Sequence, residues 1–314
     1  MRPGTIVVAL GGNALQPAGQ RVTIAEQFRH TRESLVAVVA LARAGWHLAI
    51  VHGNGPQVGD ALARNEQALD RVEPLPLGLL VASTAGWIGY MIQQSLQNAF
   101  EAAGIAREVL TIITQTVVDV TDPAGLVPVK PVGNVLTADE AAALTARGVP
   151  VGPDGSGRPR RLAPSPRPVD LVESASVKRL VDEGHVVIAA GGGGTPVYRD
   201  RVLRWEGVDA VVDKDRVAAI LAHRLAADAL LILTDVDAVH ADWGKPSARP
   251  LTTLSLDGAD QLLAGTGLGA GSMRPKLEAA AEFVRRGGAR AVIGHLAQGL
   301  EALRGETGTT ITRE

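Results

Sequence analysis

Residues 5–13, "TIVVALGGN", join an apolar run to a pair of glycines. The run 5–10 is almost continuously hydrophobic and rich in β-branched side chains, which is typical of a strand covered on both faces. Glycine at positions 11 and 12 permits a tight turn and lets backbone N–H groups approach a ligand closely. The stretch therefore predicts a buried strand whose carboxyl end opens a binding loop.

The same pattern recurs along the chain. Further strands are predicted over 47–52, 109–118, 185–190, 229–234 and 289–295. Amphipathic stretches that predict helices lie at 23–44, 56–70, 173–183, 214–226 and 276–287. Because strands alternate with helices, the sequence predicts an α/β fold with a parallel-rich sheet sandwiched by helices.

Residues 120–170 interrupt this alternation. Proline and glycine are dense there, and a short helical piece is predicted over 137–147. A long linker is one interpretation, but structureless loops of this length are uncommon in compact domains. We therefore expect one domain over 1–314, with 120–170 as a small inserted subdomain.

Composition excludes several classes of protein. The 314 residues are 46% hydrophobic and 20% charged, with a formal net charge of −2 and no cysteine. A basic nucleic-acid-binding surface is not indicated, and disulfides, thiolate metal sites and a cysteine nucleophile are excluded. The N-terminal apolar run is too short for a signal peptide or a membrane span. We expect a cytoplasmic protein that binds neither nucleic acid nor membrane.

Small and polar residues follow four of the predicted strands. They are Gly11-Gly12-Asn13, Gly53-Asn54-Gly55, Gly191-Gly192-Gly193-Gly194, and Asp235-Val236-Asp237 after "LILT". Each alone could be a simple turn, but ligands of open α/β sheets bind outside the carboxyl ends of the strands. Four such ends together favour an anion site. Neither a P-loop nor a GxGxxG motif is present.

Three lysines lie in loop contexts where they could handle phosphate. They are Lys130 in "PVKPVG", Lys214 in "VVDKDRVAA" and Lys276 in "GSMRPKLE". Phosphoryl transfer chiefly requires positioning and positive charge on the transferring oxygens. Asp215 could orient lysines, or could be an ordinary acid of a first helical turn. Surface solvation is the alternative for each lysine.

Eight runs then resemble the signature runs of carbamate kinases, in the amino-acid-kinase superfamily, and appear in that family's order. They are "VVALGGNAL", "VHGNGPQVG", "VKPVG", "RLAPSPRPVD", "VVIAAGGGGTPV", "GVDAVVDKD", "LILTDVDAV" and "GSMRPKLEAA". The resemblance implies reversible phosphoryl transfer between carbamoyl phosphate plus ADP and carbamate plus ATP, with Mg2+. It also implies an open three-layer αβα sandwich with a mostly parallel sheet, a protruding subdomain, a homodimer and a place in arginine metabolism.

The resemblance also implies a role for each matching position. Lys214 and Lys276 match lysines that stabilise the transferring phosphoryl group, Asp215 the acid that organises them, and Lys130 the subdomain lysine that reaches over the phosphate. The runs on the carbamate or carbamoyl phosphate side comprise Gly11, Gly12, Asn13, Gly53, Asn54 and Gly55. The nucleotide side comprises Gly191, Gly192, Gly193, Gly194, Thr234, Asp235, Met273 and Pro275. Because Mg2+ in such sites is held largely by phosphates and water, no protein ligand of the metal is assigned.

Three departures keep alternatives open. Gly78, Leu80 and Ala85 stand where the family often has an acid, a cysteine and a glutamine. A related kinase acting on another carboxylate, phosphate or phosphonate is one alternative. A nucleotide or metabolite sensor without turnover is the other, since a fold alone does not establish activity.

Overall fold

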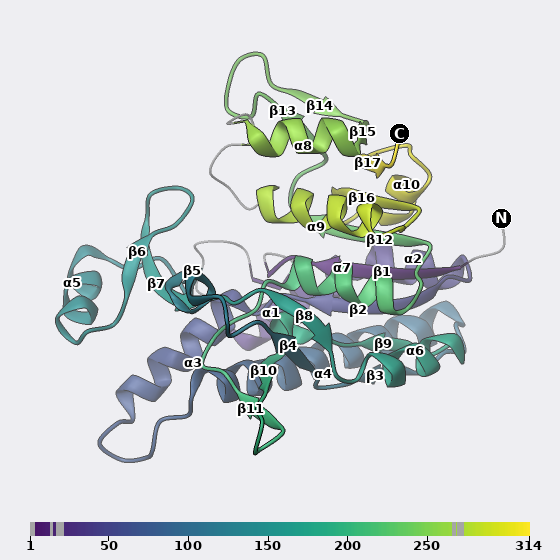
Figure 1. Cartoon of the computed structure of the whole chain (residues 1–314). Helices are drawn as coiled ribbons and strands as arrows, with labels where there is room; N and C mark the ends of the chain where they lie inside the picture. The colour runs from purple at the N-terminus through teal and green to yellow at the C-terminus, as the bar shows by residue number, and fades with distance from the viewer. Residues whose placement is uncertain (1–3, 13–14, 17–21, 266–267, 269–272) are drawn as a thin grey trace.

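The computed structural model of the chain describes residues 4–12, 15–16, 22–265, 268 and 273–314. An eight-stranded sheet forms its centre, with the strand order β15-β17-β16-β12-β1-β2-β9-β3 (Figure 1). Neighbouring strands are parallel except at the β16–β17 pair. The strands are β1 (Thr5–Leu10), β2 (His47–His52), β3 (Val109–Thr111), β9 (Val186–Ile188), β12 (Ala229–Thr234), β15 (Thr253–Ser255), β16 (Arg290–His295) and β17 (Thr309–Thr312). The prediction of an α/β fold with a mostly parallel sheet is confirmed.

Helices cover both faces of this sheet. The helices are α1 (Ile24–Ser34), α2 (Val36–Arg43), α3 (Gly55–Gln67), α4 (Leu77–Ala103), α5 (Ala138–Ala146), α6 (Ser174–Asp182), α7 (Lys214–Arg224), α8 (Leu256–Ala264), α9 (Met273–Arg285) and α10 (Gly299–Leu303). Apolar residues of α6, α7, α8 and α9 form one core with the sheet, and those of α2, α4 and α10 form another.

Strand β1 shows why these runs are apolar throughout. Val7 and Ala9 belong to the core on the α7 and α9 side, whereas Ile6, Val8 and Leu10 belong to the opposite core. Successive side chains of a strand point to opposite faces. A strand covered on both faces therefore has no position suited to a polar side chain, and the three-layer sandwich follows from this pattern.

Two predicted elements are each divided in the structure, so their predicted extents are wrong. The run 109–118 forms β3 in the central sheet and then β4 (Gln115–Val118) in another sheet, with Thr114 between them. The Thr114 hydroxyl accepts a hydrogen bond from the Ala190 N–H at 2.9 Å, which fixes the chain where it leaves the sheet. The stretch 23–44 forms α1 and α2, which meet at Leu35.

Smaller sheets lie beside the central one. A four-stranded sheet has the order β11-β10-β4-β8, with β8 (Pro168–Leu171), β10 (Thr195–Arg199) and β11 (Trp205–Gly207). A three-stranded sheet has the order β5-β7-β6, with β5 (Pro128–Val132), β6 (Val151–Pro153) and β7 (Pro159–Pro164). Strands β13 (Val239–Ala241) and β14 (Arg249–Leu251) pair with each other.

The three-stranded sheet and α5 extend from one side of the molecule (Figure 1). Contacts with α3 hold them: Arg161 of β7 forms an ion pair with Glu66, and the Asn134 amide donates to Asp60 at 2.8 Å. A Cβ at Gly59 would overlap the backbone of Gly133, so the backbone of α3 and the segment after β5 are in direct contact at these two glycines. We propose that 120–170 contains a subdomain carried on α3.

Within the described ranges, no helix is both long enough and apolar enough to span a membrane.

Candidate active site

The carboxyl ends of four adjacent strands bring the predicted site residues to one edge of the sheet. Strands β12, β1, β2 and β9 are neighbours and run parallel, so their ends lie together. Gly12, Gly53 and Lys214 meet there: a Cβ at Gly53 would lie 3.0 Å from the Gly12 nitrogen and 3.3 Å from the Lys214 side chain. Only glycine fits at position 53 without displacing its neighbours.

The four-glycine run follows β9 and closes against the end of β2. Gly192, Gly193 and Gly194 have φ values of 67°, 94° and 77°, in the left-handed region that favours glycine. A Cβ at Gly192 would overlap the Asn54 side chain. Asn54 in turn donates its amide to the Thr84 hydroxyl of α4 at 2.9 Å. The second and third predicted loops thus pack against each other, and Gly55 begins α3 beside them.

Asp215 lies between two of the predicted lysines. Its Oδ1 forms an ion pair with Lys214 Nζ, and its Oδ2 lies 3.7 Å from Lys276 Nζ. Asp215 and Lys276 are buried, although they come from the first turns of different helices, α7 and α9. A single carboxylate therefore holds two cationic side chains at the edge of the sheet.

The environment of Lys276 weakens its hold on a proton. Burial lowers the pKa of Lys276, and the charge of Lys214 lowers it further, whereas Asp215 opposes both. Asp213 and Asp235 also lie within electrostatic range of Lys276 and oppose these effects. An anion bound beside the two ammonium groups would be stabilised by their charge, and the helix N-termini of α7 and α9 would add a favourable field.

Lys130 lies apart from this pair and has a different partner. Its Nζ donates to Asp213 Oδ2 at 2.8 Å, linking β5 to the start of α7. Asp213 also caps α7, because its Oδ1 accepts from the backbone N–H groups of Asp215 at 3.0 Å and Arg216 at 3.2 Å. Burial alone would raise the pKa of Asp213, but the charges of Lys130 and Lys214 and these hydrogen bonds hold it well below its usual range.

The sequence reasoning assigned no role to Asp213. The available signal was an aspartate directly before a helical run, which is typical of an N-cap. His52, at the end of β2, was also missed. It is fully buried, its Nδ1 lies 3.0 Å from the Gly53 carbonyl oxygen, and burial lowers its pKa to about 4. Neutral His52 packs against Gly191, where a Cβ would not fit.

The predicted nucleotide residues other than the four glycines lie toward β12 and α9. Thr234 ends β12, and its hydroxyl donates to Asp235 Oδ1 at 3.0 Å. Met273 and Pro275 belong to the first turn of α9, so they adjoin Lys276. Asp235 lies within electrostatic range of Lys276. The structure therefore brings these residues to the same sheet edge as the lysines.

Of the predicted acceptor-side residues, Asn13 lies outside the described residues. Arg274, to which the sequence assigned no role, donates to the carbonyl oxygens of Leu263 at 2.5 Å and Gly265 at 3.1 Å. Arg274 therefore joins the start of α9 to the end of α8.

The described acidic side chains at this edge of the sheet do not form a metal site by themselves. They are compatible with a metal ion that is bound mainly by the phosphates of a substrate. Asp213 and Asp215 are engaged by lysines, and among the described residues no group of three or more His, Asp or Glu side chains could hold an ion. Mg2+ keeps several waters and often binds through substrate phosphates. The donor set thus fits Mg2+ that arrives with a nucleotide.

Known proteins are similar to this chain in sequence and in architecture. The model of the amino acid kinase family matches residues 4–295. A carbamate kinase of Pyrococcus horikoshii is 42% identical over 313 residues, covering 99% of each chain. A carbamate kinase of Escherichia coli K12 is 44% identical over 309 residues, covering 98% of this chain and 99% of its own. The structure of Giardia lamblia carbamate kinase bound to citric acid matches with a TM-score of 0.94 and 36% identity, covering 99% of each chain.

Proposed function

Because this chain belongs to the amino acid kinase family, and within it to the carbamate kinases, we propose that it transfers a phosphoryl group reversibly between ATP and carbamate. The products in that direction are ADP and carbamoyl phosphate. The observation that carries the proposal is the shared carboxylate: Asp215 holds Lys214 and Lys276 at the glycine-lined edge of the sheet.

The transfer itself needs little covalent help from the protein. A carbamate oxygen attacks the γ-phosphorus in line, the bond from that phosphorus to the β,γ-bridging oxygen breaks, and ADP leaves with its electron pair. We assign Lys214 and Lys276 to the oxygens of the transferring group, where positive charge stabilises the transition state. Asp215 keeps both ammonium groups in place, so they need not be reorganised during transfer.

The remaining site residues are assigned to the two substrates. Gly11, Gly12, Gly53, Asn54 and Gly55, with Asn13, would bind carbamate or carbamoyl phosphate through close backbone approach. The run Gly191–Gly194, with Thr234, Asp235, Met273 and Pro275, would bind the nucleotide. A solved Giardia lamblia carbamate kinase bound to AMP-PNP, 36% identical to this chain with a TM-score of 0.89, supports nucleotide use.

We assign Lys130 to the phosphate from the side of the three-stranded sheet. In the structure it is held by Asp213, which itself lies next to Lys214 in the sequence. A phosphate dianion bound at the lysine pair would compete with Asp213 for Lys130. Lys130 would then leave Asp213 and bind the phosphate of the substrate.

Mg2+ bound to the nucleotide phosphates would neutralise part of their charge. We also propose a cytoplasmic homodimer with a place in arginine metabolism. Exposed apolar side chains of Ile24, Leu79 and Tyr90 on α1 and α4 support a second copy as partner. Light scattering of the purified protein would give its mass in solution, and a monomeric mass at micromolar concentration would contradict the dimer.

The test of the function is ATP formation from ADP and carbamoyl phosphate with Mg2+, measured by a coupled assay. We expect turnover with purified protein, and none when Mg2+ is chelated. A protein that binds ADP but forms no ATP would instead fit a sensor without turnover.

One observation favours a second candidate, a kinase for another small acid. Leu80 and Ala85 are buried in α4, and Ala85 lies against Gly191 and thus against the glycine run. Helix α4 also contacts the acceptor side through the hydrogen bond of Thr84 with Asn54, so Leu80 and Ala85 make a helix beside the acceptor more apolar than the family pattern. ATP consumption with a panel of carboxylates, phosphates and carbamate distinguishes the two, and a clear preference for carbamate would remove the second candidate.

A further inference from the structure

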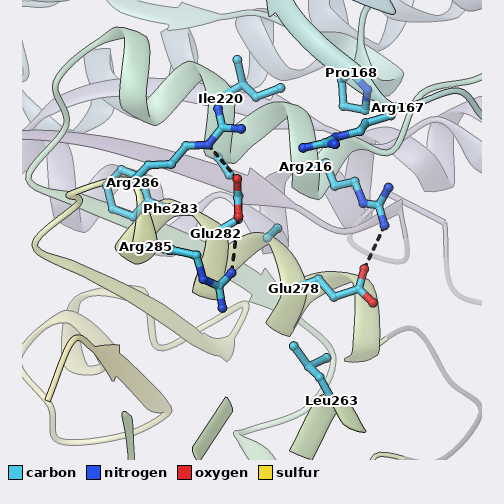
Figure 2. A pocket seen from close by; sticks show the side chains of 12 residues that line it. Arg167, Pro168, Arg216, Ile220, Leu263, Glu278, Glu282, Phe283, Arg285 and Arg286 are labelled. Atoms are coloured by element: carbon cyan, nitrogen blue, oxygen red, sulfur yellow. Dashed lines mark hydrogen bonds and ion pairs between the residues drawn. The ribbon is translucent and has the colours of Figure 1, made fainter. Parts of the chain in front are cut away.

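A cleft whose lining does not include the three site lysines lies between α7, α9 and the start of β8 (Figure 2). Its volume is about 380 Å3. Pockets that bind small molecules have volumes of about 300–1,000 Å3. The cleft is therefore large enough for a small organic ligand.

The walls of the cleft combine an apolar surface with arginines. Pro168, Ile220 and Phe283 supply apolar surface. Four arginines also line it: Arg167, Arg216, Arg285 and Arg286. The lining acids are Glu278 and Glu282, so four positive charges face two negative ones. An apolar wall beside excess guanidinium groups suits an amphiphilic anion.

Three of the arginines already have acidic partners. Arg216 Nη2 lies 3.0 Å from Glu278, Arg285 Nη2 lies 2.8 Å from Asp260, and Arg286 Nε lies 2.6 Å from Glu282. Arg167 is exposed and forms no ion pair within 4.0 Å in the described part of the chain. Figure 2 shows Arg167 beside Arg216, with Arg286 reaching in from the other side. Asp119 lies within electrostatic range of Arg167 but not at ion-pair distance, so Arg167 is the arginine of this lining that has no close acidic partner among the described residues.

We propose that this cleft is a binding site for a small organic anion, with an apolar body and one carboxylate or phosphate group, and that its occupancy changes the rate of the kinase. The apolar body lies against Ile220 and Phe283, and the anionic group binds Arg167. A neutral ligand of the same shape leaves Arg167 unmatched, and a cation is repelled.

The link to rate comes from the helices that form the walls. Arg216 lies two residues after Lys214 on α7, and Glu278 lies two residues after Lys276 on α9. Their ion pair therefore joins the N-terminal halves of the two helices that carry the lysines. An anion beside Arg167 competes with Glu278 for Arg216 and loosens this connection. This part of the inference rests on the proposed function.

Binding is tested by calorimetry on the full chain with saturating ADP present, using benzoate and phenyl phosphate as anionic probes and benzyl alcohol as the neutral one. We expect both anions to bind and benzyl alcohol to bind at least tenfold more weakly. Arg167→Gln should weaken the anions about tenfold, as loss of a charge-assisted hydrogen bond does. Arg201→Gln, which removes an exposed arginine from the β10–β11 turn, is the matched control and should bind as wild type does.

Three results would overturn the site: no binding of either anion, equal binding by the wild type and Arg167→Gln, or equal binding of benzyl alcohol. Preference between benzoate and phenyl phosphate identifies which anionic group the cleft takes. Displacement by ADP would place the probes at the nucleotide site and would also overturn the inference.

The rate is tested by ATP formation with and without saturating benzoate. We expect kcat/KM to change at least twofold in the wild type and in Arg201→Gln, and to stay constant in Arg167→Gln. Binding through Arg167 without any change in rate would overturn the regulatory part. Absence of ATP formation before any probe is added would count against the proposed function, and the calorimetry would still decide the site.

Discussion

Two groups of charged residues in this molecule face the same edge of the sheet but differ in how firmly they are held. Lys214, Lys276 and Asp215 stand on helices packed into the main core, and their side chains are 12%, 8% and 5% exposed. Lys130 stands on the three-stranded sheet, and in its pair with Asp213 the side chains are 30% and 21% exposed. The first group is preorganised for charge stabilisation, whereas the second can exchange partners. Loss of the first should therefore affect kcat, and loss of the second should affect substrate affinity.

The largest effect is expected from Lys276→Ala. Removing one group that stabilises transition-state charge lowers kcat about 10²- to 10³-fold in other enzymes. We expect a fall of that size in ATP formation, with a smaller change in KM, and the same for Lys214→Ala. The control is Lys178→Ala, which removes an exposed lysine paired with Asp182 on α6. Near-normal kcat in both site variants would remove these lysines from the proposed roles.

Asp215→Asn should come next, because it changes the position and the protonation of both lysines. Small displacements of catalytic groups can cost about a hundredfold in rate. The pH dependence of the rate tests the effect of Asp215 on the protonation of Lys276 more directly. Burial lowers the pKa of Lys276, and Asp215 opposes this effect. Removing the carboxylate should lower the pKa of Lys276 further. If the reaction needs protonated Lys276, its loss of rate with rising pH should then begin at a lower pH than in the wild type.

The measurement is kcat against pH for the wild type and Asp215→Asn. In the wild type the alkaline fall should lie below about 10.4, the ordinary pKa of lysine. In the variant it should move toward neutral pH. An unchanged alkaline limb would show that Asp215 does not act on the protonation of Lys276, whatever its effect on rate.

The strands beside Lys214, Lys276 and Asp215 were also easier to predict from the sequence than the surroundings of Lys130. The runs 5–10, 47–52 and 229–234 match β1, β2 and β12 because strands buried on both faces must be apolar throughout. Parallel strands then bring their carboxyl ends together, which is why residues as distant as Gly53 and Lys214 could be expected at one site. Local pattern and topology suffice to predict that these strand ends meet, whereas the grouping of Lys214, Lys276 and Asp215 was predicted from the family resemblance.

The rest depends on contacts between distant residues. The apolar run 109–118 carries no internal sign that it divides at Thr114, because the hydrogen bond that fixes Thr114 comes from Ala190. Helix α4 was not predicted, although its buried residues recur every three or four positions. The pairing of Lys130 with Asp213 spans 83 positions in the sequence and depends on how the three-stranded sheet sits on α3.

Lys130→Ala should have a smaller effect and a different kind of effect. A lost charge-assisted hydrogen bond to phosphate corresponds to about tenfold in affinity. We expect the KM for carbamoyl phosphate to rise by about that factor while kcat changes less, in the coupled assay at saturating ADP. An effect confined to the KM for ADP would place Lys130 on the nucleotide side and contradict the assignment.

Asp213→Asn should have the smallest effect, and it separates the two tasks of Asp213. Asparagine caps helices about as well as aspartate does, so the start of α7 is kept while the charge that holds Lys130 is lost. In the wild type the folded pKa of Asp213 lies below its unfolded value. Its charge therefore stabilises the folded state at neutral pH, and this stabilisation is lost as pH falls through about 4 and below. At pH 7 the variant should be less stable by about 1 kcal/mol.

Urea unfolding of both proteins between pH 7 and pH 3 tests this, with Asp182→Asn as the control for an exposed aspartate paired with lysine. The difference between wild type and Asp213→Asn should shrink as the pH falls below about 4, because the unfolded wild type then binds a proton at Asp213 that the folded protein, with its lowered pKa, does not. A difference that stays constant with pH would mean that the cap, and not the charge, is what the substitution removed. Lys130 would then be held by the three-stranded sheet alone, and the contrast between a preorganised group and an exchangeable one would no longer rest on Asp213.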